Sequence, residues 1–193
     1  MDITKLQKVL PPDIYLELSN VLKNRTPTKY QIAQFLANCA HETQGWTKYS
    51  ESLNYKAPRL LAVFPKYIKS LADANVLVKQ GQVAIADRVY GGRMGNKRGT
   101  SDGYNFRGGG CTHLTGRSMY ELFGASVHED IASNPDLVRT KYKLTSAFWF
   151  YDYNGLWNIA NQSNCTPLRK RVNGGVNGLL EVEAYFKKYF ALL

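Results

Sequence analysis

Several features are scarce in this chain of 193 residues, and each scarcity removes a class of protein. No apolar run approaches the roughly 18 residues that a membrane-spanning helix needs, so we expect no membrane insertion. The N-terminal stretch 1–5 lacks the charged-then-apolar profile of a secretory signal peptide. We therefore expect synthesis in a cytoplasm, and any action outside it requires another export route.

Cysteine and histidine are also rare. The cysteines form neither a paired framework nor a Cys-x-x-Cys spacing, and their odd number is typical of a reducing compartment. They are Cys39, Cys111 and Cys165. His41 and Glu42 begin like the helix motif of zinc proteases, but Gly45 stands where that motif needs a second histidine. We expect neither a metal nor a cofactor.

A cysteine nucleophile with a histidine base is an alternative. Cys111 and His113 are two positions apart, which on a strand would direct both side chains to the same side. Peptidases with catalytic Cys and His use such a pair, but no third group that would orient the base is visible. This alternative is therefore the less favoured one.

Charge and composition indicate a folded protein with a polyanionic partner. The chain has 25 basic and 15 acidic side chains, a formal net charge of +10, and these charges are spread along it. Its hydrophobic content of 44% excludes a disordered chain. Nucleic acid, bacterial cell wall and anionic membrane surfaces all attract a cation of this size, so charge alone does not choose among them.

The hydrophobic pattern predicts a mainly α protein with one domain, 1–193, and no separate wall-binding domain. Nine of the 16 glycines lie between 91 and 116, an irregular region where we expect binding residues. No alternating strand pattern repeats. The predicted helices span 2–10, 13–24, 57–64, 69–80, 82–90 and 144–160, with others that begin at Thr28, at Thr166-Pro167 and near Leu179.

The segment 41–55 carries two carboxylates, Glu42 and Glu51, nine residues apart. On one straight helix they would be roughly 13 Å apart and on opposite faces. Gly45 is expected to end the helix and let the chain fold back. Glu42 is predicted at the edge of that helix's apolar face, where it is partly desolvated. Glycoside hydrolysis requires a proton-donating carboxyl and a second carboxylate, and this pair of glutamates could supply both. The plainer interpretation of the same pair is two unrelated surface charges.

Three other features have plainer explanations. The glycine run at 107–110 lacks the Gly-Lys-Ser/Thr of a phosphate loop. The basic run at 169–171 is interpreted as a solvated helix face, in preference to a DNA contact. Trp46 fits core packing and a sugar platform equally well.

Four blocks in order resemble glycoside hydrolase family 19, the chitinase-like lysozyme fold, and especially its phage endolysin branch. They span positions 41 to 175. The blocks are His41-Glu42-Thr43 with Glu51-Ser52-Leu53-Asn54-Tyr55; 90–96 through 102–108; Leu114-Thr115-Gly116-Arg117 with Tyr120; and Arg171-Val172-Asn173-Gly174-Gly175.

The resemblance implies a two-lobed, lysozyme-like or chitinase-like fold with a substrate cleft and little or no β structure. It implies that Glu42 is the general acid, Glu51 the general base and Thr115 the holder of the attacking water. An inverting enzyme needs its carboxyls roughly 6.5 to 9.5 Å apart to admit that water.

The resemblance also implies substrate-binding residues. Asn54, Tyr55 and Asn173 would hold sugar or order the site by hydrogen bonds. His113 stands where the family usually has glutamine, and its ring can donate or accept a hydrogen bond as that amide does.

From these features we expect an endolysin-type glycosidase that cleaves β-1,4 bonds of bacterial peptidoglycan by an inverting mechanism. Its partners would be peptidoglycan glycan strands and the anionic bacterial cell wall, not nucleic acid, and the enzyme would be a monomer. It would be made in the host cytoplasm and act at the wall or periplasm after release. The alternatives are a chitinase acting on N-acetylglucosamine polymers and a catalytically silent cell-wall-binding module.

Overall fold

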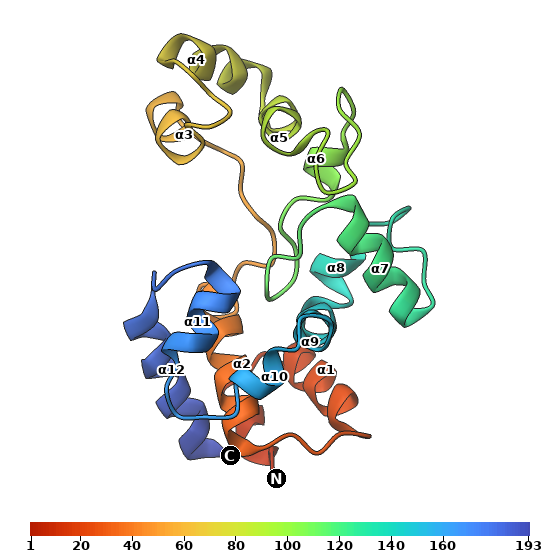
Figure 1. The fold of residues 1–193 in the computed structure, drawn as a ribbon. Coiled ribbons are helices and arrows are strands. Elements are labelled where there is room, and N and C mark those ends of the chain that lie inside the picture. The colour runs from red at the N-terminus through yellow and green to blue at the C-terminus, as the bar shows by residue number, and fades with distance from the viewer. The chain divides into compact units, whose positions relative to one another are not determined.

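The computed structural model describes residues 1–193 and is mainly helical, as predicted (Figure 1). Its β pairing consists of two isolated antiparallel bridges, Ser50 with Gly109 and Gly109 with Leu114. The chain divides into two compact units. Unit 1 comprises Met1–Tyr49, Gly110–His113 and Leu137–Leu193, and unit 2 comprises Ser50–Gly109 and Leu114–Asp136.

Unit 1 holds a short 3-10 helix and seven α-helices: η1 (Thr4–Lys8), α1 (Pro12–Leu22), α2 (Lys29–Glu42), α8 (Leu137–Thr140), α9 (Lys143–Tyr153), α10 (Leu156–Ile159), α11 (Thr166–Asn173) and α12 (Leu179–Leu192). Helix α2 is its axis, since residues 32–40 are all buried. Helix α12 runs along α2, and α1 packs on α9 (Figure 1).

The start of α2 follows the sequence closely. The Thr28 hydroxyl accepts a hydrogen bond from the Gln31 N–H at 3.2 Å, and the Gln31 amide oxygen accepts one from the Thr28 N–H at 2.8 Å. This reciprocal capping box satisfies two backbone donors that a helix N-terminus otherwise leaves unpaired. Helix α2 therefore begins where predicted.

Unit 2 holds α3 (Ala57–Val63), α4 (Leu71–Gln80), α5 (Gln82–Tyr90), α6 (Asp102–Asn105) and α7 (Arg117–Val127). Helices α3, α4 and α5 share a small core around Leu60 and Ile85. The Asp102 carboxylate binds the Arg117 guanidinium through two contacts of 2.8 and 2.9 Å, and it also accepts the Lys97 N–H. This buried carboxylate orders the glycine-rich segment that the sequence identified as a binding region.

The structure differs from the predicted elements in three places. The helix expected over 144–160 is divided into α9 and α10 at Gly155, whose φ is +62°. The helix expected over 2–10 is the five-residue 3-10 helix η1. Helices α6, α7 and α8 had no sequence-based prediction. No helix is both long enough and apolar enough to cross a membrane.

Candidate active site

Glu42 is the last residue of α2, and its side chain is 18% exposed. This position is unfavourable for a carboxylate, because the C-terminal end of a helix carries partial negative charge. The cost is about 0.3 to 1 kcal/mol at an exposed site. A carboxylate in such a place requires compensation from a neighbour.

Arg169 supplies that compensation. Its side chain is fully buried, and Nη1 lies 2.5 Å from Oε1 of Glu42. Its Nε donates to the carbonyl of Asn177 at 2.7 Å, which fixes the guanidinium plane from the other side. The carboxylate of Glu42 is thus held through Oε1, and Oε2 is left without a protein partner.

The interpretation of the basic run as a solvated face is therefore wrong for Arg169 and holds for its two neighbours. Lys170 and Arg171 are exposed, whereas Arg169 is 0% exposed. Successive helical residues differ by about 100°, so Arg169 and Arg171 point about 200° apart. Three consecutive cations on a helix cannot share one face.

The Glu42 carboxylate lies in a hollow of about 550 Å³ that belongs wholly to unit 1. Three of the predicted site residues, Glu42, His113 and Asn173, line it together. The other lining residues are His41, Gln44, Asn177, Glu181 and Tyr185.

One wall of this hollow is fixed by a hydrogen bond between two side chains. Nδ1 of His41 lies 2.7 Å from Oε2 of Glu181. Gly178 faces the same imidazole, and a Cβ there would overlap the ring. Gly178 also has φ +72°, a backbone conformation that favours glycine. The close approach of the α12 N-terminus to His41 therefore depends on Gly178.

The turn after Glu42 differs in detail from the prediction that Gly45 ends the helix. Helix α2 already ends at Glu42, and Gln44, Gly45 and Trp46 all have φ between 51° and 72°. The turn is anchored by Trp46, whose side chain is buried and whose indole N–H donates to the Tyr189 hydroxyl at 2.7 Å. Trp46 is therefore a core residue.

Glu51 lies in unit 2, just after the bridge between Ser50 and Gly109. The Tyr90 hydroxyl donates to Oε1 of Glu51 at 2.6 Å, and the N–H of Gly108 donates to Oε2 at 3.1 Å. Burial, followed by the Glu51 charge, raises the pKa of Tyr90 well above its usual value, so the phenol stays a neutral donor. Both oxygens of this carboxylate are oriented by the protein.

Thr115 directly follows Leu114, the residue of the second bridge, as Glu51 directly follows Ser50 of the first. Both flanking segments are antiparallel to the segment that carries Gly109, so they run parallel to each other. The Gly116 N–H donates to the Phe106 carbonyl at 2.8 Å, so the pairing register shifts beyond the second bridge. Glu51 and Thr115 therefore both adjoin the bridges at Gly109 in unit 2.

Tyr55 and Asn54 complete the predicted set in unit 2. Tyr55 is half-buried, and burial and then the Glu51 charge raise its pKa. Its ring packs edge-on against Phe64, with centroids 5.7 Å apart. Asn54 is exposed, with its backbone N–H 3.4 Å from the Ser52 hydroxyl. Tyr55 is thus close to the Glu51 carboxylate in a fixed orientation.

The Cys111 alternative loses its geometric basis. Residues 110–113 form a turn, not a strand, and His113 has φ +51°. Cys111 is completely buried, and this burial raises its thiol pKa well above the usual value. A nucleophile needs the thiolate form and access to substrate. Cys111 therefore functions as a core residue.

Two residues that contact the predicted carboxylates, Arg169 and Tyr90, were not predicted from the sequence. A signal existed for Arg169, because Leu168 and Val172 are apolar and lie one turn apart on either side of it. Nothing local distinguishes Tyr90, whose contact with Glu51 joins residues 39 positions apart. The structure contains no group of three or more His, Cys, Asp or Glu side chains arranged to hold a metal.

The helical architecture defines a chitinase-like, lysozyme-like fold. A chitinase C variant superposes with a TM-score of 0.59 and 16% identity, covering 100% of this chain and 91% of that one. A bacterial family 19 chitinase gives the same TM-score with 18% identity, covering 99% and 93%.

Sequence comparison is more specific. A glycosyl hydrolase family 19 domain-containing protein of Haemophilus influenzae is 33% identical over 159 residues, 79% of this chain and 75% of that protein. The chain belongs to glycoside hydrolase family 19. An acidic 27 kDa endochitinase of Solanum lycopersicum is 38% identical over 73 residues, only 37% of this chain and 30% of the plant enzyme. No family model matches the chain.

Proposed function

We propose that this family 19 protein is a phage endolysin-type glycosidase that cleaves β-1,4 bonds of bacterial peptidoglycan with inversion. The observation that carries the proposal is the placement of Glu42, an otherwise unfavourable helix C-terminal carboxylate, in a hollow with His113 and Asn173. One oxygen is bound to Arg169 and the other is left to act.

In this mechanism Glu42 is the general acid, and Oε2 delivers the proton to the leaving glycosidic oxygen. Glu51, oriented by Tyr90 and the Gly108 N–H, is the general base that takes a proton from water. Thr115, which adjoins the same pair of bridges as Glu51, would hold that water. Inversion follows because water attacks the anomeric carbon directly, without a covalent intermediate.

The remaining predicted residues would bind the glycan. His113 and Asn173 line the hollow around the acid and offer hydrogen bonds to sugar hydroxyl and acetamido groups. Asn54 and Tyr55 would do the same beside the base. The enzyme would work as a monomer without a metal or cofactor.

The choice of peptidoglycan over chitin rests on charge. A net charge of +10 attracts the protein to an anionic envelope and raises its concentration there, whereas a neutral polymer exerts no such attraction. The tomato relative is an endochitinase, so chitin hydrolysis is the second candidate. The same charge also suits a catalytically silent wall-binding module.

The test compares lysis of outer-membrane-permeabilised bacteria with hydrolysis of soluble chitin oligomers. The proteins are wild type, Glu42→Gln, Glu51→Gln and Cys111→Ala. We expect lysis by wild type and Cys111→Ala, and a loss of at least about 100-fold in each Gln variant, because general acid or base catalysis contributes about 10²- to 10⁴-fold. Proton NMR of the first soluble product distinguishes inversion from retention.

Each alternative predicts a different pattern. Faster release of soluble sugar from chitin oligomers than from cell walls would indicate a chitinase. Retention on walls with no soluble product from any protein indicates the binding module. Loss of lysis in Cys111→Ala alone would indicate a cysteine peptidase. Undiminished lysis by both Gln variants would refute the acid and base assignments.

A further inference from the structure

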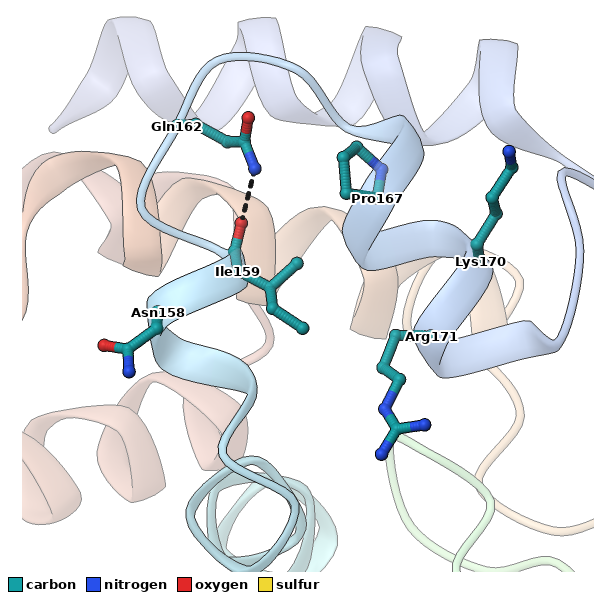
Figure 2. A pocket seen from close by; sticks show the side chains of 6 residues that line it. All are labelled: Asn158, Ile159, Gln162, Pro167, Lys170 and Arg171. Carbon is teal, nitrogen blue, oxygen red and sulfur yellow. Dashed lines mark hydrogen bonds between the residues drawn. The ribbon is translucent and has the colours of Figure 1, made fainter.

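A second hollow, of about 560 Å³, lies between α10 and α11 in unit 1 (Figure 2). Ile159 and Pro167 form its apolar part. The Gln162 amide lies across it and donates to the Ile159 carbonyl at 3.1 Å. The hollow is lined by Asn158, Ile159, Gln162, Pro167, Lys170 and Arg171.

Two exposed cations border this hollow, Lys170 and Arg171. Neither forms an ion pair, and no carboxylate lines the hollow. In unit 1 Arg25 is paired with Asp152 at 2.6 Å and Lys143 with Asp13 at 2.6 Å, whereas the exposed Lys187 and Lys188 of α12 form no ion pair. The hollow therefore combines an apolar floor with two cationic groups that lack a counter-ion.

Its place in the fold links this hollow to the Glu42 hollow. Helix α11 carries Lys170 and Arg171 on its outer side, and its last residue, Asn173, lines the hollow that holds Glu42. Two residues of helix advance only about 3 Å along the axis but turn the side-chain direction by about 200°, so the hollows lie on different sides of the same end of α11.

We infer that the α10–α11 hollow binds the acidic stem peptide attached to the peptidoglycan strand that is being cleaved. This inference rests on the proposed function and specifies its substrate: a peptide-bearing strand in preference to a bare glycan. Stem peptides combine alanine methyl groups with free carboxylates. The methyls fit against Ile159 and Pro167, and the carboxylates pair with Lys170 and Arg171.

Other ligands match fewer of these features. A bare glycan strand keeps only the lactyl carboxylates of its muramic acids and offers no alanine methyl groups to the apolar floor. A phosphate polymer would satisfy the cations but has no use for the apolar floor. Because each exposed ion pair contributes modestly, the hollow would improve the capture of substrate without changing the chemical step.

The first test measures kcat/KM on soluble glycan strands that carry their peptides and on the same strands after the peptides are removed by an amidase. The variant is Lys170→Gln/Arg171→Gln. We expect the ratio between the two substrates to fall about five- to tenfold, through KM, because two exposed ion pairs are lost.

A matched control carries the same charge change on another helix. Lys187→Gln/Lys188→Gln removes two exposed lysines of α12. The ratio should stay at the wild-type value in this control. An equal fall in both double variants, or no fall in the first, would overturn the inference and leave general charge attraction as the explanation. Inactivity of the wild type on both substrates would instead refute the proposed function.

A binding measurement decides the inference independently of turnover. A synthetic acidic stem peptide is titrated into Glu51→Gln while the methyl resonances of Ile159 are followed. We expect saturable shifts that high salt weakens and that Lys170→Gln/Arg171→Gln abolishes. Shifts with inorganic phosphate but none with the peptide, or no shift at Ile159, would show that the ligand class is wrong.

Discussion

Removal of the Arg169 guanidinium gives the sharpest test of how Glu42 is held. Arg169→Met keeps much of the buried volume but deletes the group that lies 2.5 Å from Oε1 of Glu42 and 2.7 Å from the Asn177 carbonyl. Breaking a buried pair by removing one partner costs about 3 to 5 kcal/mol. Because the Glu42 side chain is 18% exposed, water recovers part of this, and we expect about 3 kcal/mol.

The loss should be visible as a melting-temperature decrease of roughly 6 to 12 °C, since a domain of this size loses roughly 2 to 4 °C per kcal/mol. Glu42→Gln should also destabilise the protein, because it leaves the fully buried Arg169 cation without its carboxylate. The double variant, Arg169→Met/Glu42→Gln, removes both charges together. It should therefore be less destabilised than the sum of the two single changes.

Urea unfolding of wild type, both single variants and the double variant measures this coupling. We expect a coupling free energy of about 2 to 3 kcal/mol, at the upper end for residues in direct contact. Additivity of the single variants within about 0.5 kcal/mol would refute the reasoning, because independent sites behave in that way. The double variant should also be inactive, which separates the loss of the acid from the loss of stability.

Three further predictions concern other parts of the fold. Burial raises the folded-state pKa of Glu17 above 4.5, so the stability of the wild type falls as pH rises through that pKa. Glu17→Gln should therefore have a higher urea midpoint than the wild type above pH 4.5 and no such advantage below it. Gly178→Ala should lower stability by more than Gly174→Ala, because both have positive φ but only Gly178 would press a Cβ into His41, and thermal unfolding checks this. Tyr90→Phe removes the donor to the carboxylate of Glu51, the proposed general base, and steady-state kinetics should show kcat reduced about tenfold or more with KM little changed; an equal kcat would contradict its orienting role.

The parts of the fold that follow from local sequence were predictable. The capping box of Thr28 and Gln31 fixed the start of α2, and the apolar repeat that follows fixed its buried face. The edge position predicted for Glu42 matches its partial exposure. These features involve residues within a few turns of one another, where spacing alone carries the information.

Contacts between distant segments were not predictable from one sequence. Arg169 reaches Glu42 across 127 residues, and Tyr90 reaches Glu51 across 39. The face of Arg169 was misjudged because a run of cations suggests solvent, whereas helix geometry separates neighbouring side chains by about 100°. The positive φ of Gln44 and Trp46 was also not predictable, because neither residue is a glycine. The conformation depends on the way that the turn is anchored by distant contacts.

Helix α11 carries the buried partner of Glu42 and also the residues to which we assign substrate specificity. The contact between its inner side chain, Arg169, and Glu42 offsets the cost of burying the guanidinium and the cost of a carboxylate at a helix C-terminus. Loss of the Glu42 carboxylate would therefore destabilise the protein even if the protein had no activity. The outer side chains Lys170 and Arg171 have no such structural duty. If the α10–α11 hollow binds the stem peptide as inferred, change on the outer side of α11 would alter which polymer is captured while Glu42, the proposed acid, stays in place.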